Sequence, residues 1–166
     1  MKVSAGLMIY RKKNLELEVL IVHPGGPFWA KKDKGAWSIP KGEVEDGEAD
    51  LLAVAKREFA EETGQPVPEG EYLELGSVKN KSGKVIHAWA VEGDLDAAQI
   101  KSNVFAMEWP PKSGQQQEFP EVDRAGWFVP DKAQEKLNPA QVSLIDHLIE
   151  LLGMEVPAQP EQITLL

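Results

Sequence analysis

The sequence contains no cysteine among its 166 residues, which excludes disulfide bonds, thiolate metal sites and a cysteine nucleophile. Any metal ion must therefore be held by oxygen or by histidine. The three histidines, His23, His87 and His147, do not have the spacing of a metal site. The amino terminus has too short an apolar run for a secretory signal, so a cytoplasmic location is expected.

Positive charge is also scarce, because 18 Lys and Arg stand against 27 Asp and Glu and give a net charge of -9. Nucleic-acid polymers and membrane surfaces are themselves anionic, so neither is an expected partner. A small anionic substrate bridged by a cation is compatible with this charge. The length predicts a single domain at residues 1–153, followed by a loosely attached C-terminal tail at 154–166. No oligomeric state is predicted.

The apolar pattern predicts an α/β sandwich with a mixed sheet. Strands are predicted at residues 3–10, 15–22, 71–79, 84–91, 104–109 and 126–129. Helices are predicted at 50–63 and at 139–152, the second with Asn138 as N-cap and Gly153 as C-cap. Two long segments without periodicity, 23–37 and 110–125, are predicted as loops, and loops of this length tend to be functional.

Three acids, Glu58, Glu61 and Glu62, lie at the end of the first predicted helix, within an arc of roughly 100°. Like charges at this spacing, and acids in a last helical turn, each cost a few tenths of a kcal/mol. One interpretation is a solvated acidic face that Lys56 and Arg57 partly neutralise. The other is a site for a hard divalent cation such as Mg²⁺, which takes oxygen ligands.

The stretch "GEVEDGEADLLAVAKREFAEETG" at residues 42–64 resembles the Nudix box, G-x5-E-x7-R-E-U-x-E-E-x-G-U, where U is bulky and apolar. The matching residues are Gly42, Glu48, Arg57, Glu58, Phe59, Glu61, Glu62 and Gly64. Eight residues instead of seven separate Glu48 from Arg57, and Gln65 takes the last apolar position. We place the extra residue at Ala49, in the turn before the helix, which keeps the helical acids in register. The resemblance implies a Nudix-type α/β/α sandwich.

The resemblance also implies a reaction, namely metal-assisted attack of water on the diphosphate of a nucleoside diphosphate derivative. Mg²⁺ is the implied cofactor, and Mn²⁺ can replace it. Glu61 and Glu62 are the implied principal ligands, together with the carbonyl oxygen of Gly42. Glu58 is implied either as a ligand or as the base toward the attacking water.

Further residues take their implied roles from the same resemblance. Arg57 is expected to orient the acids together with Glu48. Many family members add an acid from a later loop, for which Glu121 is our first choice and Glu118 the second. For either one, a solvated loop acid is the alternative.

The residues before the box bear on the substrate. The stretch with Lys41 directly before the box glycine resembles the corresponding stretch in hydrolases of dinucleoside polyphosphates and diphosphoinositol phosphates. This resemblance implies that Lys41 would contact an extra phosphate of the substrate. Trp29, with Phe28, is a candidate for stacking on a base, and Lys32 for contacting phosphates. Core packing of Trp29 and solvated lysines are the alternatives. The inserted residue and Gln65 favour a second hypothesis, a non-catalytic Nudix domain that binds a nucleotide or a protein partner.

Overall fold

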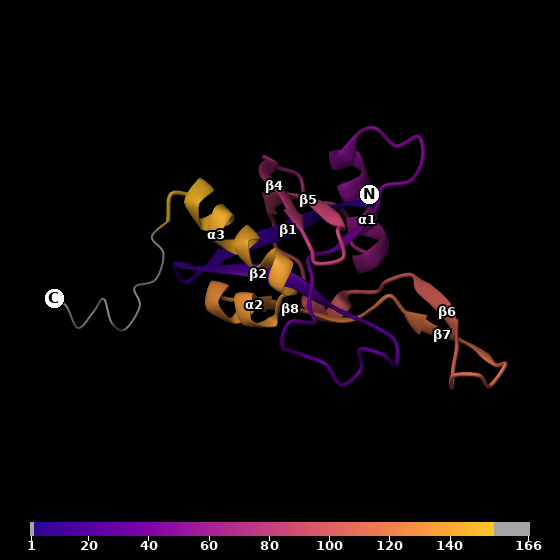
Figure 1. The fold of residues 1–166 in the computed structure, drawn as a ribbon. Coiled ribbons are helices and arrows are strands. Elements are labelled where there is room, and N and C mark those ends of the chain that lie inside the picture. The colour runs from indigo at the N-terminus through magenta and orange to yellow at the C-terminus, as the bar shows by residue number, and fades with distance from the viewer. Residues whose placement is uncertain (1, 155–166) are drawn as a thin grey trace.

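The computed structural model describes residues 2–154, which form a mixed sheet with helices on both faces (Figure 1). The strands are β1 (Val3–Lys13), β2 (Glu16–Pro24), β3 (Lys41–Glu43), β4 (Leu73–Lys79), β5 (Val85–Glu92), β6 (Val104–Glu108), β7 (Gln116–Pro120) and β8 (Val122–Phe128). The helices are α1 (Leu51–Thr63), α2 (Pro130–Lys136) and α3 (Val142–Leu151), with 3-10 turns η1 (Ala97–Gln99) and η2 (Pro139–Gln141). The predicted fold class is confirmed.

Within residues 2–154, six strands make one sheet in the order β4-β5-β1-β2-β8, and β3 pairs with β1. Strand β1 runs parallel to β5 and antiparallel to β2 and β3, so the sheet is mixed as predicted. Asn14 and Leu15 join β1 to β2 with φ angles of 53° and 68°. Positive φ at both central residues is the turn geometry that matches the right-handed twist of a hairpin.

Strand β1 is buried on both faces, and the alternation of its side chains supplies two separate cores. Leu7 and Ile9 belong to the cluster that packs under Phe59 of α1. Met8 belongs to the cluster that packs under Leu148 of α3. Helix α1 therefore covers one face of the sheet, and α2 and α3 cover the other.

Strands β6 and β7 form a two-stranded sheet of their own, which extends away from the main body (Figure 1). The prediction of an unbroken loop at 110–125 is wrong here, because β7 occupies Gln116–Pro120 and β8 begins at Val122. Four of the five side chains of β7 are exposed, so the segment lacks the apolar alternation that marks a strand.

The carboxyl-terminal part also differs from the prediction. Helix α2, of seven residues, was not predicted, because Ala133 is its only buried residue. The predicted helix at 139–152 begins as the 3-10 turn η2, and α3 ends with Leu152 rather than Gly153 as C-cap. Met154 packs against the core, and the rest of the predicted tail at 154–166 lies outside the described residues. In the described part of the chain, no helix is long and apolar enough to cross a membrane.

Candidate functional site

Helix α1 carries the acids of the box, and its ends are fixed by local capping. At the start of the helix, the side chain of Asp50 accepts a hydrogen bond from the amide of Ala53 at 3.2 Å. At its end, the amide of Gly64, whose backbone adopts the left-handed helical conformation, donates to the carbonyl of Ala60 at 2.9 Å. Ala49 precedes the N-cap, in the turn where the extra residue is predicted. The helical register of the acids is therefore continuous from the first turn to the last.

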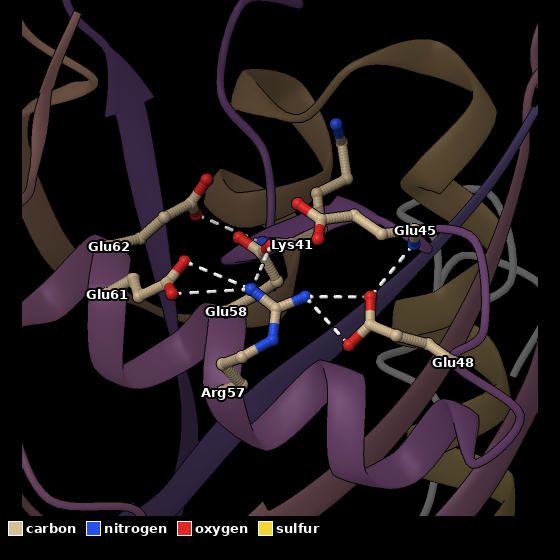
Figure 2. A network of polar contacts seen from close by, with 7 residues as sticks. All are labelled: Lys41, Glu45, Glu48, Arg57, Glu58, Glu61 and Glu62. Carbon is tan, nitrogen blue, oxygen red and sulfur yellow. Dashed lines mark hydrogen bonds and ion pairs between the residues drawn. The ribbon is translucent and has the colours of Figure 1, made fainter.

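Arg57 lies at the centre of a carboxylate network (Figure 2). Its Nη1 donates to Glu58 Oε1 at 3.0 Å and to both oxygens of Glu61 at 3.3 Å. Its Nη2 donates to the two oxygens of Glu48 at 3.0 and 3.1 Å. Glu48 also accepts from the amide of Glu45 at 2.8 Å, and this bond, with Arg57, lowers the pKa of Glu48. Glu48 thus contacts Arg57 despite the extra residue.

Strand β3 approaches α1 closely, and its middle residue, a glycine, leaves room for the side chain of Glu58. A Cβ on Gly42 would lie 1.9 Å from Cδ of Glu58, well inside van der Waals contact. The amide of the preceding residue, Lys41, donates to Glu62 Oε2 at 3.0 Å. Glu58 and Glu62 are therefore both held against the backbone of β3.

The acids of α1 and the residues of β3 border a cleft of about 550 Å³, which we call the acidic cleft. Its lining residues are Lys41, Gly42, Glu43, Val44, Glu45, Asp46, Glu58, Glu62 and Glu121. Glu43, Glu45 and Asp46 were not singled out from the sequence, although they fall inside the box, where the pattern leaves them free. Glu61 is not part of the lining and faces Arg57 instead.

Glu121 reaches the acidic cleft from the short connection between β7 and β8. Its amide donates to the carbonyl of Asn103, and its carbonyl accepts from the amide of Gly25, each at 2.9 Å. Glu118, the second choice from the sequence, is exposed on β7 and does not line the cleft. The structure therefore brings Glu121, and not Glu118, to the acids of α1.

Three carboxyls of the cleft, those of Glu58, Glu62 and Glu121, hold their protons more tightly than usual. Burial raises the pKa of Glu62 from its ordinary 4.5 to about 8. The pKa of Glu58 is raised by burial and by the charge of Glu61, and the pKa of Glu121 is raised by partial burial and again by Glu61. A positive charge in the cleft would favour the ionised form of all of them.

The donor chemistry fits a hard divalent cation, since carboxylate and carbonyl oxygens are the ligands that Mg²⁺ takes. Within residues 2–154, however, no group of three or more His, Asp or Glu side chains stands in the arrangement of a metal site. Glu58 and Glu61 point to Arg57, and Glu62 points to the amide of Lys41 (Figure 2). The guanidinium of Arg57 supplies the positive charge here, and the predicted ligand set stays a prediction.

A second cavity, of about 380 Å³, lies beside the acidic cleft, and we call it the aromatic pocket. Its lining residues are Pro24, Gly25, Gly26, Pro27, Phe28, Trp29, Phe105, Met107 and Glu121. Trp29 lines this pocket and also packs partly against the core, while Lys32 places its Nζ 4.0 Å from the ring centre of Phe28. Trp29 and Lys32 do not line the acidic cleft, whereas Lys41 does. Phe105 and Met107 were missed from the sequence, although their alternation in "VFAME" was a usable signal.

The three histidines make contacts that connect elements of the fold. His23 is fully buried, with Nδ1 2.8 Å from Asp123 Oδ1 and Nε2 2.6 Å from the carbonyl of Lys32, so it ties the loop after β2 to β8. His87 contacts a glutamate of β4, and His147 contacts a backbone carbonyl of the same strand.

The profile of the NUDIX domain matches residues 1–148. A comparison with curated proteins gave no match. Among solved structures, the NUDIX domain of Shewanella oneidensis NrtR complexed with ADP ribose aligns with a TM-score of 0.61 and 19% identity, over 90% of this chain and 87% of that one. The C. elegans Ap4A hydrolase binary complex aligns with a TM-score of 0.61 and 23% identity, over 92% and 98%. The MutT protein of Methanosarcina mazei Go1 aligns with a TM-score of 0.58 and 20% identity, over 91% and 94%. At these identities the solved structures support the fold.

Proposed function

This chain belongs to the Nudix family of hydrolases, which cleave phosphoanhydride bonds, and on that premise we propose that it is a divalent-cation-dependent pyrophosphohydrolase. Its proposed substrates are nucleoside diphosphate derivatives, with dinucleoside polyphosphates among them. The proposed cofactor is Mg²⁺, with Mn²⁺ as a substitute. A cytoplasmic location, and a small-molecule partner rather than a nucleic-acid polymer or a membrane, form part of the same proposal.

The observation that carries this proposal is the meeting of acids from three separate segments in one cleft. Glu58 and Glu62 come from α1, Glu43 from β3, and Glu121 from the connection between β7 and β8. The raised pKa values of Glu58, Glu62 and Glu121 show that these carboxyls resist ionisation where they stand. Folding alone does not favour such crowding, so the arrangement favours the binding of a cation.

The residues that would hold the cation are Glu58, Glu61 and Glu62 with the carbonyl oxygen of Gly42. When bound, a divalent cation neutralises charge on phosphate oxygens and lowers the pKa of a coordinated water. Glu58 and Glu62 already line the cleft, and Glu61 stands on the same helical turn, hydrogen-bonded to Arg57.

The remaining residues bind, position and accept a proton. Lys41 places a positive charge in the wall of the cleft, where it would attract the diphosphate. Arg57, anchored by Glu48, acts as a positioning residue that fixes the carboxylates of α1. Glu121 is suited to accept the proton of the attacking water, because partial burial and the charge of Glu61 raise its pKa and make it a stronger base. Glu58 can serve the same purpose, since its pKa is also raised.

A substrate panel tests the proposal. Purified protein would be assayed with Mg²⁺ or Mn²⁺ against Ap4A, ADP-ribose, NADH, nucleoside triphosphates and diphosphoinositol phosphates. We expect turnover of at least one of them, its loss in Glu62→Gln, and normal turnover in Glu16→Gln, which alters an exposed acid of β2. If none of these compounds is hydrolysed, or if Glu62→Gln keeps full activity, the assignment is contradicted.

A second candidate function is a non-catalytic Nudix domain that binds a nucleotide or a protein partner. Two observations favour it: Glu58 and Glu61 are already bonded to Arg57, and no metal arrangement stands among residues 2–154. This candidate predicts that a nucleotide raises the melting temperature without being hydrolysed. Turnover that disappears in Glu58→Gln excludes it, and melting in EDTA followed by Mg²⁺ tests the cation separately.

A further inference from the structure

The aromatic pocket and the acidic cleft are neighbours, because Glu121 lines both of them. The pocket's volume of about 380 Å³ lies toward the lower end of the range for small-molecule sites, about 300–1,000 Å³. A ligand that extended from the cleft past Glu121 would pass from a cavity lined mainly by acids into one lined mainly by aromatic and apolar side chains. The two cavities thus suit the two halves of one molecule.

The walls of the pocket come from elements far apart in the sequence. The loop after β2 contributes Phe28 and Trp29, and strand β6 contributes Phe105 and Met107. Phe105 and Met107 are partly buried while their neighbours on the strand are exposed, so both point to the same face of the hairpin. Phe28 remains 62% exposed at this pocket, an unusual exposure for a large apolar side chain.

Close backbone packing fixes the hairpin formed by β6 and β7 against the loop. A Cβ on Gly25 would lie 2.0 Å from the carbonyl oxygen of Pro120, and a Cβ on Gly26 would lie 2.9 Å from Cζ of Phe105. Gly26 also has a φ of +95°, a conformation that residues with a side chain rarely adopt. Gly25 therefore allows the loop to approach the backbone of β7, and Gly26 leaves room for the ring of Phe105 at the pocket. The pocket is thus a built feature of the fold.

We infer that the aromatic pocket holds a planar aromatic ring of the substrate, such as a nucleobase, while the acidic cleft holds its diphosphate. Hairpin β6–β7 is then the element that selects the group attached to the diphosphate. This inference rests on the proposed hydrolysis of a phosphoanhydride in the cleft. Flat rings are the occupants that fit best, since aromatic side chains pair with other rings by stacking or edge-to-face contact. The shared wall at Glu121 favours a ligand that also carries phosphate over an apolar segment of a protein.

Two ligands test the inference, namely AMP, which carries a nucleobase, and ribose 5-phosphate, which lacks it. Their binding to the full chain would be measured by calorimetry with Mg²⁺ present. Because stacking on aromatic side chains is worth about 1–3 kcal/mol per base, we expect AMP to bind about 5- to 150-fold more tightly than ribose 5-phosphate. Phe28→Ala and Phe105→Ala, on separate elements, should each reduce this preference and leave the binding of ribose 5-phosphate unchanged.

Val104→Ala is the matched control, because Val104 adjoins Phe105 on the same strand, is 56% exposed and does not line the pocket. It should keep the full preference for AMP. Phe28 is largely exposed, so Phe28→Ala reports on binding even if Phe105→Ala unfolds the hairpin. Equal binding of AMP and ribose 5-phosphate by the unaltered protein, or an unchanged preference in Phe28→Ala, would overturn the inference.

Turnover provides a separate readout. For a ring-bearing substrate such as ADP-ribose, Phe28→Ala should raise KM by about 10-fold and leave kcat nearly unchanged, because the ring lies away from the reacting phosphate. Hydrolysis that is indifferent to Phe28 overturns this inference and leaves the proposed function standing. The absence of any phosphoanhydride hydrolysis overturns the proposed function, whereas a ring-dependent preference in binding would still place the ring in this pocket.

Discussion

Replacing Glu62 by glutamine should stabilise the cation-free protein at pH 8, although it removes a residue that we assign to the site. Burial raises the pKa of Glu62 to about 8, whereas the unfolded chain exposes this carboxyl at its ordinary 4.5. Between these two values the folded protein binds a proton that the unfolded chain has lost. The contribution of the protonated Glu62 to the free energy of unfolding is therefore complete below pH 4.5 and is lost as the pH rises through 8.

The size of this effect follows from the two pKa values. One pKa unit corresponds to about 1.4 kcal/mol, so ionising Glu62 in the fold removes up to about 5 kcal/mol of unfolding free energy. A domain of this length loses about 2–4 °C in melting temperature per kcal/mol, which gives a decrease of up to about 10–20 °C. In Glu62→Gln the side-chain carbonyl can still accept the hydrogen bond from Lys41, and no charge is buried.

Scanning calorimetry in EDTA between pH 5 and 8.5 measures this effect. We expect the melting temperature of the unaltered protein to fall over this range, and that of Glu62→Gln to fall much less. Adding Mg²⁺ at pH 8 should raise the melting temperature of the unaltered protein and not that of Glu62→Gln. Glu16→Gln, at an exposed position, controls for the loss of one charge. Parallel melting profiles of the unaltered protein and Glu62→Gln would refute this reasoning.

Three further predictions concern the site and the core. Gly42→Ala should abolish turnover with the fold kept, because the new Cβ would lie 1.9 Å from Cδ of Glu58; circular dichroism and kcat report the two effects. Glu121→Gln should lower kcat by about 10²–10⁴-fold if Glu121 is the base, whereas the control Glu118→Gln should change kcat less than about twofold. If the pH–rate profile of Glu121→Gln keeps its acidic limb, Glu121 is not the base. Leu148→Ala, at a position with 0% exposure, should cost about 2–5 kcal/mol in denaturant unfolding and leave KM unchanged.

The first helix and its acids could be predicted from the sequence because their determinants are local. Asp50 caps the helix, Gly64 closes it, and the spacing of Glu58, Glu61 and Glu62 fixes their common face. The partner of Glu48 was harder to place, since the extra residue breaks the family pattern. Its contact with Arg57 depends on the path of the turn before the helix, and spacing alone does not set that path.

The hairpin and the aromatic pocket could not be predicted because they depend on contacts between distant segments. Gly26 meets Phe105 across 79 residues of sequence, and no periodicity in either segment records that contact. Strand β7 has mostly exposed side chains and pairs only with β6 among the described strands, so burial left little mark on its composition. Helix α2 escaped prediction for a similar reason, since its seven residues bury only Ala133.

The hydrogen bonds of Arg57 bear on which ions the site can take up. Its guanidinium already places one positive charge on Glu58 and Glu61, and Glu48 holds it from the other side. A monovalent ion such as Na⁺ or K⁺ would bring no more charge than Arg57 already provides, so displacing those hydrogen bonds would gain it little. A divalent ion brings twice the charge. Arg57 thus favours the binding of divalent over monovalent ions. The site should therefore still bind a divalent ion in the presence of a large excess of monovalent salt.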